Sequence, residues 1–366
     1  MKITAIKLGR ISVPLRVPFK TALRRVDSVE DIIVEVHTDT GEIGYGEAPP
    51  TGAITGDTTG AIIGAITDHI RKALVGRDID DFEDLTTALD GAVVKNSSAK
   101  AAVDMALWDL YGQKYQIPVY KLLGGARKKI ITDITISVNP PEEMARDAVN
   151  AIKRGYDTLK VKVGVDPTLD VARLKAIRDA VGSAPRIRID ANQAWAPKEA
   201  VRLLNEMQES GLAIELVEQP VKAHDLEGLT YVTERSYVPV LADESVFSAE
   251  DALKIVEMRA ADLINIKAHE MWWFDKCPQD CCLGGDLWHG MHDSAVCWRA
   301  KVSVNAAVHL RPVPKKVITR VDLDGPVLCS EDPIDGGAVF NEKEITVSDA
   351  PGLGIKGIRG LTYLDV

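Results

Sequence analysis

The sequence predicts an α/β barrel of parallel strands joined to a smaller α+β domain. Two observations predict this fold class. From about residue 130 onward, short runs rich in β-branched residues alternate with amphipathic segments of helical spacing. In addition, a polar residue recurs at the end of one run after another. A chain of 366 residues is long enough for one large barrel and a second, smaller domain.

The repeating part contains six runs that read as strands, separated by segments that read as helices. These segments often begin with acidic residues and end with glycine, as helices do. Strands separated by single helices must be parallel, because each crossover returns the chain to the same end of the sheet. Room remains for two more units before residue 326, so we expect eight strands. The runs are DITISVN, TLKVKVG, IRIDANQ, IELVEQP, PVLADES and LINIKA.

An open, doubly wound sheet is the main alternative to a barrel. A nucleotide-binding sheet of that kind carries a glycine-rich phosphate loop after an early strand. No such loop follows any early run here, which favours the barrel.

The pattern divides the chain into three regions. Residues 1–125 are expected to form the α+β capping domain, in which DIIVEVHTDTGEIGYGEA reads as two strands around a Thr-Gly turn. Residues 126–326 carry the barrel. Residues 327–366 again show strand and turn character, and we expect this tail to return to the capping domain.

Composition excludes several classes of function. A net charge of −10 argues against nucleic acid as the main partner, since phosphate binding requires a basic face. The N-terminal residues alternate like a strand and do not resemble a signal peptide, and no apolar run is long enough for a membrane span. Outside residues 268–300 the only cysteine is Cys329. We therefore expect a cytoplasmic protein without disulfides and without a membrane partner.

Charged residues mark the ends of five consecutive predicted strands. From Lys162 onward the separations are 28, 28, 25 and 24 residues, about one βα unit each. The same phase in each unit places these side chains on one rim of the barrel, where barrel enzymes carry their catalytic residues. In order they are Lys160 and Lys162, then Asp190, Glu218, Asp243 and Lys267.

The types of these residues point to proton transfer beside a hard cation. Asp190, Glu218 and Asp243 would repel one another unless a cation neutralised them, and ligation by oxygen suits Mg²⁺. Lys162 and Lys267 belong to the second and sixth strands, which lie opposite each other in an eight-membered ring. Two opposed amines can remove a proton from one face of a carbon and return one to the other face through an enolate. We assign Lys160, two residues before Lys162, an electrostatic role toward a substrate carboxylate.

The strand-end motifs TLKVKVG, IRIDANQAW, IELVEQP, LADESV and DLINIK resemble the muconate-lactonizing subgroup of the enolase superfamily. The resemblance covers nearly the whole chain. It implies a modified (β/α)8-type, TIM-like barrel of (β/α)7β form with a capping domain, and Mg²⁺ as the cofactor. The stretches PFKTALRRV, GEAPPTGAITGD and ITRVDLDGP resemble the dipeptide epimerases, in particular those that act on L-Ala-D/L-Glu.

The resemblance also implies roles for substrate-binding residues. Asp322 and Asp324 correspond to the aspartates that bind the α-ammonium group of the dipeptide, and Arg24 to the arginine that meets the glutamate side chain. Thr135 is counted with this substrate-binding set.

The implied activity is isomerisation, with inversion of the α-carbon of the C-terminal residue of a dipeptide during recycling of cell-wall (peptidoglycan) peptides. The partner is then a small dipeptide, and homo-oligomerisation is left open. Three alternatives share the same chemistry: an epimerase for another dipeptide, an N-acylamino acid racemase and a cycloisomerase. An inactive barrel that serves as a binding protein is the alternative of a different class.

Residues 268–300 do not fit this pattern. They hold four of the five cysteines and four of the six tryptophans. The helix and the seventh strand expected by the resemblance are missing, and family-like sequence resumes near Ala300. Removing three single bases between Lys267 and Val302 restores a family-like reading. We therefore interpret the stretch as a frameshifted readout of the gene, which resequencing of this window would test.

Two other interpretations of this stretch are weaker. The spacing of its cysteines and histidines matches no paired zinc-binding pattern. A tryptophan patch is disfavoured because the adjacent Trp272 and Trp273 would point apart on a strand. If the printed residues are present, we expect the barrel to lose its proper seventh strand and the enzyme to be damaged or inactive. The candidate zinc ligands are Cys277, Cys281, Cys282, His289, His292 and Cys297.

Overall fold

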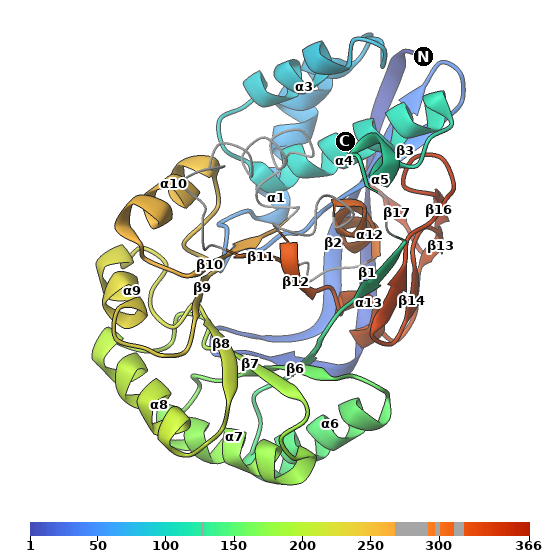
Figure 1. The fold of residues 1–366 in the computed structure, drawn as a ribbon. Helices are drawn as coiled ribbons and strands as arrows, with labels where there is room; N and C mark the ends of the chain where they lie inside the picture. The colour runs from blue at the N-terminus through green and yellow to red at the C-terminus, as the bar shows by residue number, and fades with distance from the viewer. Residues whose placement is uncertain (126–127, 268–291, 297–300, 311–317) are drawn as a thin grey trace.

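The centre of the protein is an eight-stranded sheet whose neighbouring strands are parallel and follow the order of the chain. The computed structural model describes residues 1–125, 128–267, 292–296, 301–310 and 318–366. Figure 1 shows these strands as a barrel beside a second domain, so the predicted fold class is confirmed. The barrel strands are β5 (Ile134–Ile136), β6 (Thr158–Lys162), β7 (Arg186–Asp190), β8 (Ile214–Glu218), β9 (Val240–Ala242), β10 (Leu263–Ile266), β11 (His292–Val296) and β12 (Ile318–Asp322).

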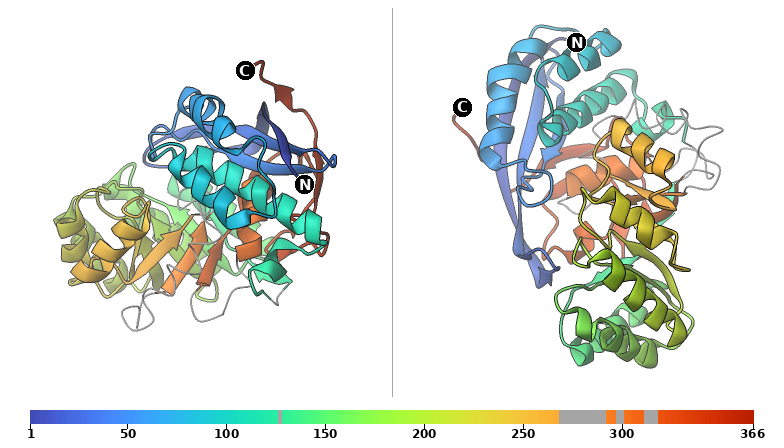
Figure 2. Two further views of the ribbon diagram at one scale, coloured as in Figure 1. Left: turned by 90° about the horizontal axis from the view of Figure 1, so that it is seen from above. Right: turned by 90° about the vertical axis from the view of Figure 1, so that its left-hand side faces the viewer.

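Helices between successive strands cover the outside of this barrel (Figures 1 and 2). Local sequence explains where several begin: proline occupies the first turn of four of the helices named below, and Asp166, Asp225 and Ser248 cap three with side-chain hydrogen bonds. Their apolar faces pack on outward-facing strand residues such as Leu159 and Val161, which form one buried core. These helices are α6 (Pro141–Lys153), α7 (Pro167–Val181), α8 (Pro197–Glu209), α9 (Leu226–Thr233), α10 (Ala249–Met258) and α12 (Lys301–Leu310), and the short α13 (Gly325–Leu328) follows the last barrel strand.

The barrel interior has a polar half and an apolar half below the strand ends. Leu216, Leu241 and Leu263 form a small buried cluster on neighbouring strands. On the other side Arg188 donates to Asp133 at 2.7 Å and to Glu215 at 2.8 Å. Arg320 of β12 also donates to Glu215, at 3.2 Å. These two arginines and two carboxylates form an ionic layer inside the barrel, which is not the usual filling by branched apolar residues.

The capping domain is an antiparallel sheet with helices on one face, as the two views in Figure 2 show. The strand order is β17-β1-β2-β3, so a strand from the C-terminal tail completes the edge beside β1. The strands are β1 (Ile3–Lys20), β2 (Arg25–Thr38), β3 (Ile43–Ala48) and β17 (Thr362–Tyr363). The helical segments are α1 (Thr59–Gly64), the π-helical turn η1 (Ala65–Ile70), α2 (Arg71–Leu74), α3 (Phe82–Gly91), α4 (Ser97–Tyr115) and α5 (Val119–Leu122).

The rest of the tail forms short strands at the side of the barrel. One pair consists of β13 (Ile334–Gly336) and β16 (Ile355–Ile358), and another of β14 (Val339–Asn341) and β15 (Glu344–Thr346). Strand β15 also pairs with β4 (Lys129–Ile131), which directly precedes the barrel. The tail therefore contacts both the start of the barrel and the capping sheet.

Strand β3 and helix α4 approach each other closely because two glycines face two alanines. A Cβ atom on Gly46 would lie 1.7 Å from the carbonyl oxygen of Ala102, and one on Gly44 would lie 2.1 Å from that of Ala106. Two residues along a strand cover about the same distance as four residues along a helix. Gly44 and Gly46 can therefore both contact the helix, at Ala106 and Ala102.

We expect Gly46→Ala to destabilise the protein by about 1–3 kcal/mol or more, because a backbone carbonyl cannot move aside as a side chain can. Chemical unfolding in urea measures this loss. Gly357→Ala is a matched control in a strand, because a Cβ atom there would meet nothing within 4 Å. Equal unfolding midpoints for the two variants would contradict the proposed contact.

A long hairpin of β1 and β2 reaches from the capping domain to the barrel (Figures 1 and 2). Near its tip, the backbone of Lys20 exchanges hydrogen bonds with Ser137 and Val138, both at 3.2 Å. The ammonium group of Lys20 also donates to Asn139 at 2.7 Å. Gly164, two residues after β6, has a φ of +94°, and a Cβ atom on it would lie 3.5 Å from the Cβ of Ala22 at the tip. The hairpin is thus fixed where the first two barrel strands end.

The seventh strand is a point on which the sequence prediction was wrong. We expected the printed residues before Val302 to provide no such strand, yet β11 lies between β10 and β12 and pairs with both in parallel. Backbone groups make a strand ladder, so an unusual side-chain pattern does not prevent pairing. Residues 268–291 and 297–300, on which the frameshift and zinc interpretations mainly rest, lie outside the described residues.

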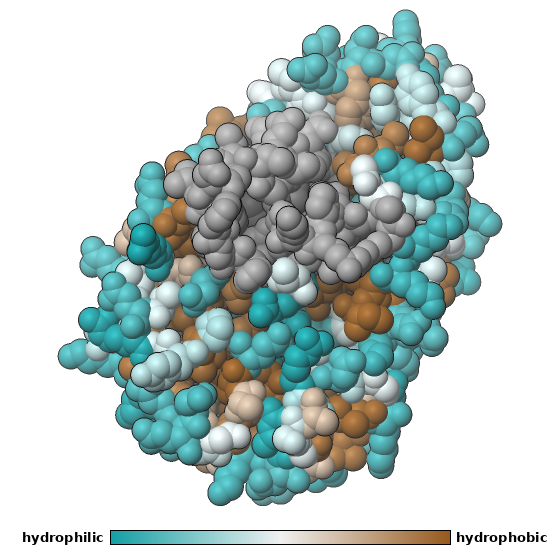
Figure 3. Space-filling view, viewed as in Figure 1, coloured by the Kyte–Doolittle hydropathy of each residue, from teal (hydrophilic) through white to brown (hydrophobic). Residues whose placement is uncertain are grey.

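The distribution of polar residues on the surface agrees with an apolar core that lies between the layers of the fold. In the face seen in Figure 3, polar residues follow the outer edge formed by α7, α8 and α9. None of the helices in the described part of the chain combines the length and apolar character needed to cross a membrane.

Candidate active site

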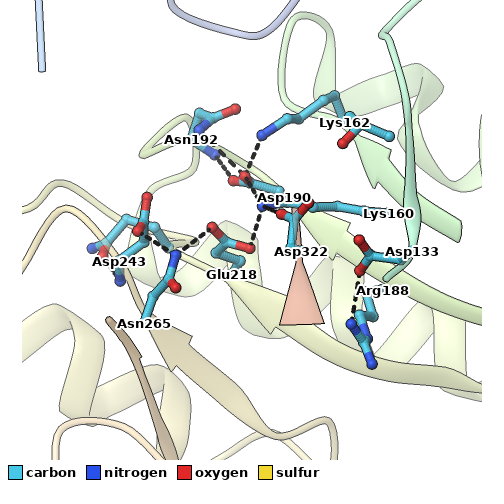
Figure 4. A network of polar contacts seen from close by, with 12 residues as sticks. Asp133, Lys160, Lys162, Arg188, Asp190, Asn192, Glu218, Asp243, Asn265 and Asp322 are labelled. Atoms are coloured by element: carbon cyan, nitrogen blue, oxygen red, sulfur yellow. Dashed lines mark hydrogen bonds and ion pairs between the residues drawn. The ribbon is translucent and has the colours of Figure 1, made fainter. Parts of the chain in front are cut away.

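The strand-end residues predicted from the sequence meet at one end of the barrel (Figure 4). Asp190 and Glu218 are the last residues of β7 and β8, and Asp243 and Lys267 directly follow β9 and β10. Lys160 and Lys162 point from β6 into the same region. All six side chains are buried. Parallel strands explain this convergence, because their carboxyl ends lie at the same edge.

Lys160 lies at the centre of the group. Its Nζ atom is 2.7 Å from Glu218, 2.7 Å from Asp322 and 3.3 Å from Asp190. Figure 4 shows it between these carboxylates. Although burial opposes it, the surrounding carboxylates raise the pKa of Lys160 well above its usual value. Lys160 therefore stays a fixed positive charge among the acids.

The two outer lysines are each bound to a different aspartate. Lys162 donates to Asp190, and Lys267 lies 2.8 Å from Asp243. Their strands, β6 and β10, are four positions apart in the sheet, with β7, β8 and β9 between them. The amines thus approach the centre from separate strands, each held by a carboxylate of a neighbouring element.

The three predicted metal ligands do not surround a single point in this structure. Within the described part of the chain, no group of three or more His, Cys, Asp or Glu side chains is arranged to hold a metal ion. Nitrogen donors lie between the carboxylates instead: Lys160 joins Asp190 and Glu218, and the amide of Asn265 is 3.5 Å from Glu218 and 2.7 Å from Asp243. The structure therefore differs from the expected ligand shell.

The charges of the site nevertheless fit a divalent cation. Six buried carboxyl groups and only three buried amino groups belong to the described site. The carboxyl groups belong to Asp190, Glu218, Asp243, Glu244, Asp322 and Asp324, and the amino groups to Lys160, Lys162 and Lys267. Burial and then repulsion from Asp190 raise the pKa of Glu218 to about 8. Such repulsion is what a bound cation relieves, and carboxylate oxygens are the ligands that Mg²⁺ prefers.

Asp322 and Asp324 lie where the last barrel strand meets the first. The backbone N–H of Thr135 donates to Asp324 at 2.7 Å, and that of Leu323 donates to the hydroxyl of Thr132 at 2.7 Å. One oxygen of Asp322, one of Asp324 and the hydroxyl of Thr135 are buried without a hydrogen-bond partner. Burial and then Asp322 raise the pKa of Asp324 to about 7. The hydroxyl of Thr135 is the only side-chain donor among these three groups, so the two aspartates have more acceptor oxygens than the corner has donors.

Arg24 lies at the tip of the β1–β2 hairpin. Its backbone carbonyl accepts from the N–H of Thr21 at 3.0 Å, and its own N–H donates to the hydroxyl of Thr21 at 3.2 Å. The side chain is partly exposed. The hairpin tip that carries Arg24 is fixed beside the ends of the first two barrel strands.

Three polar residues of the site were not singled out from the sequence. Asn192 follows Asp190 and bonds it through both its backbone and its amide, and the same amide is 3.3 Å from Glu244. Asn265 lies two residues before Lys267, so strand alternation alone would have placed it on the same side. Glu244 directly follows Asp243, and only the loop geometry brings it back to the site.

Comparisons with known protein families agree with this geometry. Residues 143–357 match the family described as "Enolase C-terminal domain-like". Residues 3–124 match the "Mandelate racemase / muconate lactonizing enzyme, N-terminal domain". The two matches together span the barrel and the capping domain.

Characterised relatives are similar over almost the full length. The L-Ala-D/L-Glu epimerase of Clostridium acetobutylicum is 55% identical over 98% of this chain and 100% of its own. A substrate-liganded structure of the L-Ala-D/L-Glu epimerase from Bacillus subtilis has 43% identity and a TM-score of 0.93, covering 98% of this chain and 99% of that one. A dipeptide epimerase from Enterococcus faecalis, solved with Mg and L-Leu-L-Tyr, has 38% identity and a TM-score of 0.91 over 98% and 100%. These relatives are isomerases.

Proposed function

We propose the function of this chain from its family. The chain belongs to the enolase superfamily, in the branch of the mandelate racemase and muconate lactonizing enzymes. The function is Mg²⁺-dependent epimerisation of a dipeptide at the α-carbon of its C-terminal residue. The observation that carries it is the pair of lysines, Lys162 and Lys267, each held by its own aspartate on strands four positions apart.

In this proposal the two lysines act in turn on one carbon. One takes the α-proton as the carbon–hydrogen bond breaks, and the other donates a proton to the opposite face. Lys160 holds a positive charge near the substrate carboxylate. Asp190, Glu218 and Asp243 would hold Mg²⁺, which would supply further positive charge beside that carboxylate as the enolate forms.

The corner formed by Asp322, Asp324 and Thr135 supports a substrate with a free α-ammonium group. An ammonium group donates N–H hydrogen bonds, and in this corner each of the two aspartates has one buried oxygen without a partner. A positive charge there would also relieve the repulsion between the two aspartates. An N-acyl substrate would bring no charge to this place, so a dipeptide fits better.

We propose L-Ala-D/L-Glu as the substrate, in recycling of cell-wall peptides. The 55% identical relative is named for that activity, and Arg24 at the hairpin tip offers a positive charge for a side-chain carboxylate.

Hydrogen exchange tests the proposal directly. With L-Ala-L-Glu and Mg²⁺ in D₂O, we expect the α-proton of glutamate to exchange and L-Ala-D-Glu to appear, both followed by NMR. A chelator should stop both, and added Mg²⁺ should restore them. A panel of other dipeptides and N-acetyl-L-Glu serves as the comparison. Exchange with N-acetyl-L-Glu but not with any dipeptide would refute the assigned substrate class, and no exchange with any compound would refute the epimerase proposal.

A further inference from the structure

Each of the two outer lysines lies over a phenylalanine ring. The Nζ atom of Lys162 is 5.8 Å from the centre of the Phe19 ring, and that of Lys267 is 5.6 Å from the centre of the Phe247 ring. Both distances are within the range in which an ammonium group is attracted to an aromatic face. Each amine thus has one aspartate and one aromatic ring among its neighbours.

The two rings come from unrelated parts of the fold. Phe19 belongs to β1 of the capping domain, is 5% exposed and lies opposite Val26 in the hairpin. The next residue, Lys20, carries the hydrogen bonds that fix the hairpin to the barrel. The position of this ring against Lys162 is therefore set by the docking of the hairpin.

Phe247 belongs to the barrel itself. It lies in the loop between β9 and α10, four residues after Asp243, and is partly buried. Its backbone N–H is 3.4 Å from Asp251, and the next residue, Ser248, caps α10 through Asp251. The helix cap therefore fixes the position of the second ring, independently of the capping domain.

We infer that Phe19 and Phe247 are paired positioning residues, one for each proposed base. This inference rests on the proposed function. When a lysine takes the α-proton, the carbon–hydrogen bond breaks, a nitrogen–hydrogen bond forms and the amine becomes an ammonium ion. The attraction of the ring face for the amine holds the nitrogen at the position from which it exchanges a proton with the carbon, so the ring assists transfer in both directions. In the second half of the reaction the other lysine loses a proton to carbon, and its ring is left facing a neutral amine.

This arrangement has a consequence that a general loss of structure would not produce. Removing one ring raises the barrier for proton transfer by one lysine in both directions. The overall equilibrium between epimers cannot change, but the enolate now partitions differently. When the affected lysine has taken the proton, the enolate is returned to the starting epimer by that same lysine, so return becomes rarer. When the other lysine has taken the proton, the affected lysine must complete the inversion, so return to the starting epimer becomes more frequent.

The experiment measures this partition in Phe19→Leu and Phe247→Leu. Each epimer is incubated separately with Mg²⁺ in D₂O, and early deuterium in the remaining substrate is divided by deuterium in the product. In each variant we expect the ratio to move in opposite directions for the two epimers, by about threefold to tenfold, and the two variants to be mirror images. Phe19→Tyr and Phe247→Tyr keep the ring and should restore the ratios of the unaltered protein.

Phe340→Leu is the matched control. Lys301 lies 5.9 Å from the centre of that ring, so the variant loses the same kind of contact away from the site. Its ratios should not change. Either leucine variant alone suffices, should the other fail to fold. If the unaltered protein exchanges but the ratios of the leucine variants do not shift, the inference is overturned and the proposed function stands. The same holds if the ratios shift in the same direction for both epimers. No exchange by the unaltered protein would overturn the proposed function and the inference with it.

Discussion

Lys162→Met is expected to lower the rate of epimerisation by about 100-fold to 10,000-fold, the range that a positioned acid or base contributes. Inversion needs two proton transfers on opposite faces, so loss of either amine stops the complete reaction. Methionine keeps the length and the buried apolar stem of the side chain. The same loss is expected for Lys267→Met.

Each variant should keep exchange with one epimer only. The remaining lysine can still remove and return a proton on its own face, so deuterium enters one epimer without inversion. The two variants should differ in which epimer exchanges, as measured by NMR in D₂O. Lys175→Met, on the exposed side of α7, is the control and should be fully active. If both variants exchanged the same epimer, the lysines could not lie on opposite faces of the carbon.

Arg188→Met is expected to reduce the free energy of unfolding by about 3–5 kcal/mol, the cost of leaving one partner of a buried ion pair alone. Arg188 donates to Asp133 at 2.7 Å and to Glu215 at 2.8 Å within the barrel interior. Without it, the fully buried Asp133 would have to bind a proton or leave its place. Unfolding in urea, monitored by circular dichroism, measures the loss.

Two further variants separate this explanation from a simple loss of packing. Adding Asp133→Asn to Arg188→Met removes the unpaired charge and should recover part of the stability. Arg202→Met breaks an ion pair with Glu206 on the exposed face of α8 and should change stability by less than about 1 kcal/mol. A similar loss in the buried and the exposed arginine variants would rule out the ionic layer as a main contributor.

The predictable part of the fold is the part that repeats. Strand ends about one βα unit apart placed Lys162, Asp190 and Glu218 on one rim, and the structure brings these three together. This inference needed only the spacing of residues and the parallel direction of strands. The position of Asn265 was equally accessible, because it shares the alternation of its strand with Lys267.

Other features depend on contacts that no local pattern contains. Asp133 and Arg188 are 55 residues apart, and a single charged residue in a strand carries no mark of its partner. Phe19 meets Lys162 only because the hairpin docks on the barrel. The prediction of a missing seventh strand was wrong for the opposite reason: it relied on side chains, while β11 is defined by its backbone pairing. The alternation of its strand placed Lys160 on the same rim, but it did not reveal the direct contacts of Lys160 with Asp190, Glu218 and Asp322.

The strand order of the capping sheet bears on how the protein is made. Tyr363 pairs with Gly9, so this ladder joins residues more than 350 positions apart. On the ribosome, the corresponding edge of β1 stays bare until the barrel has been synthesised. A bare edge is a template for neighbouring chains. Truncation just before Thr362 should therefore favour aggregation of newly made protein, even though the barrel itself would be intact.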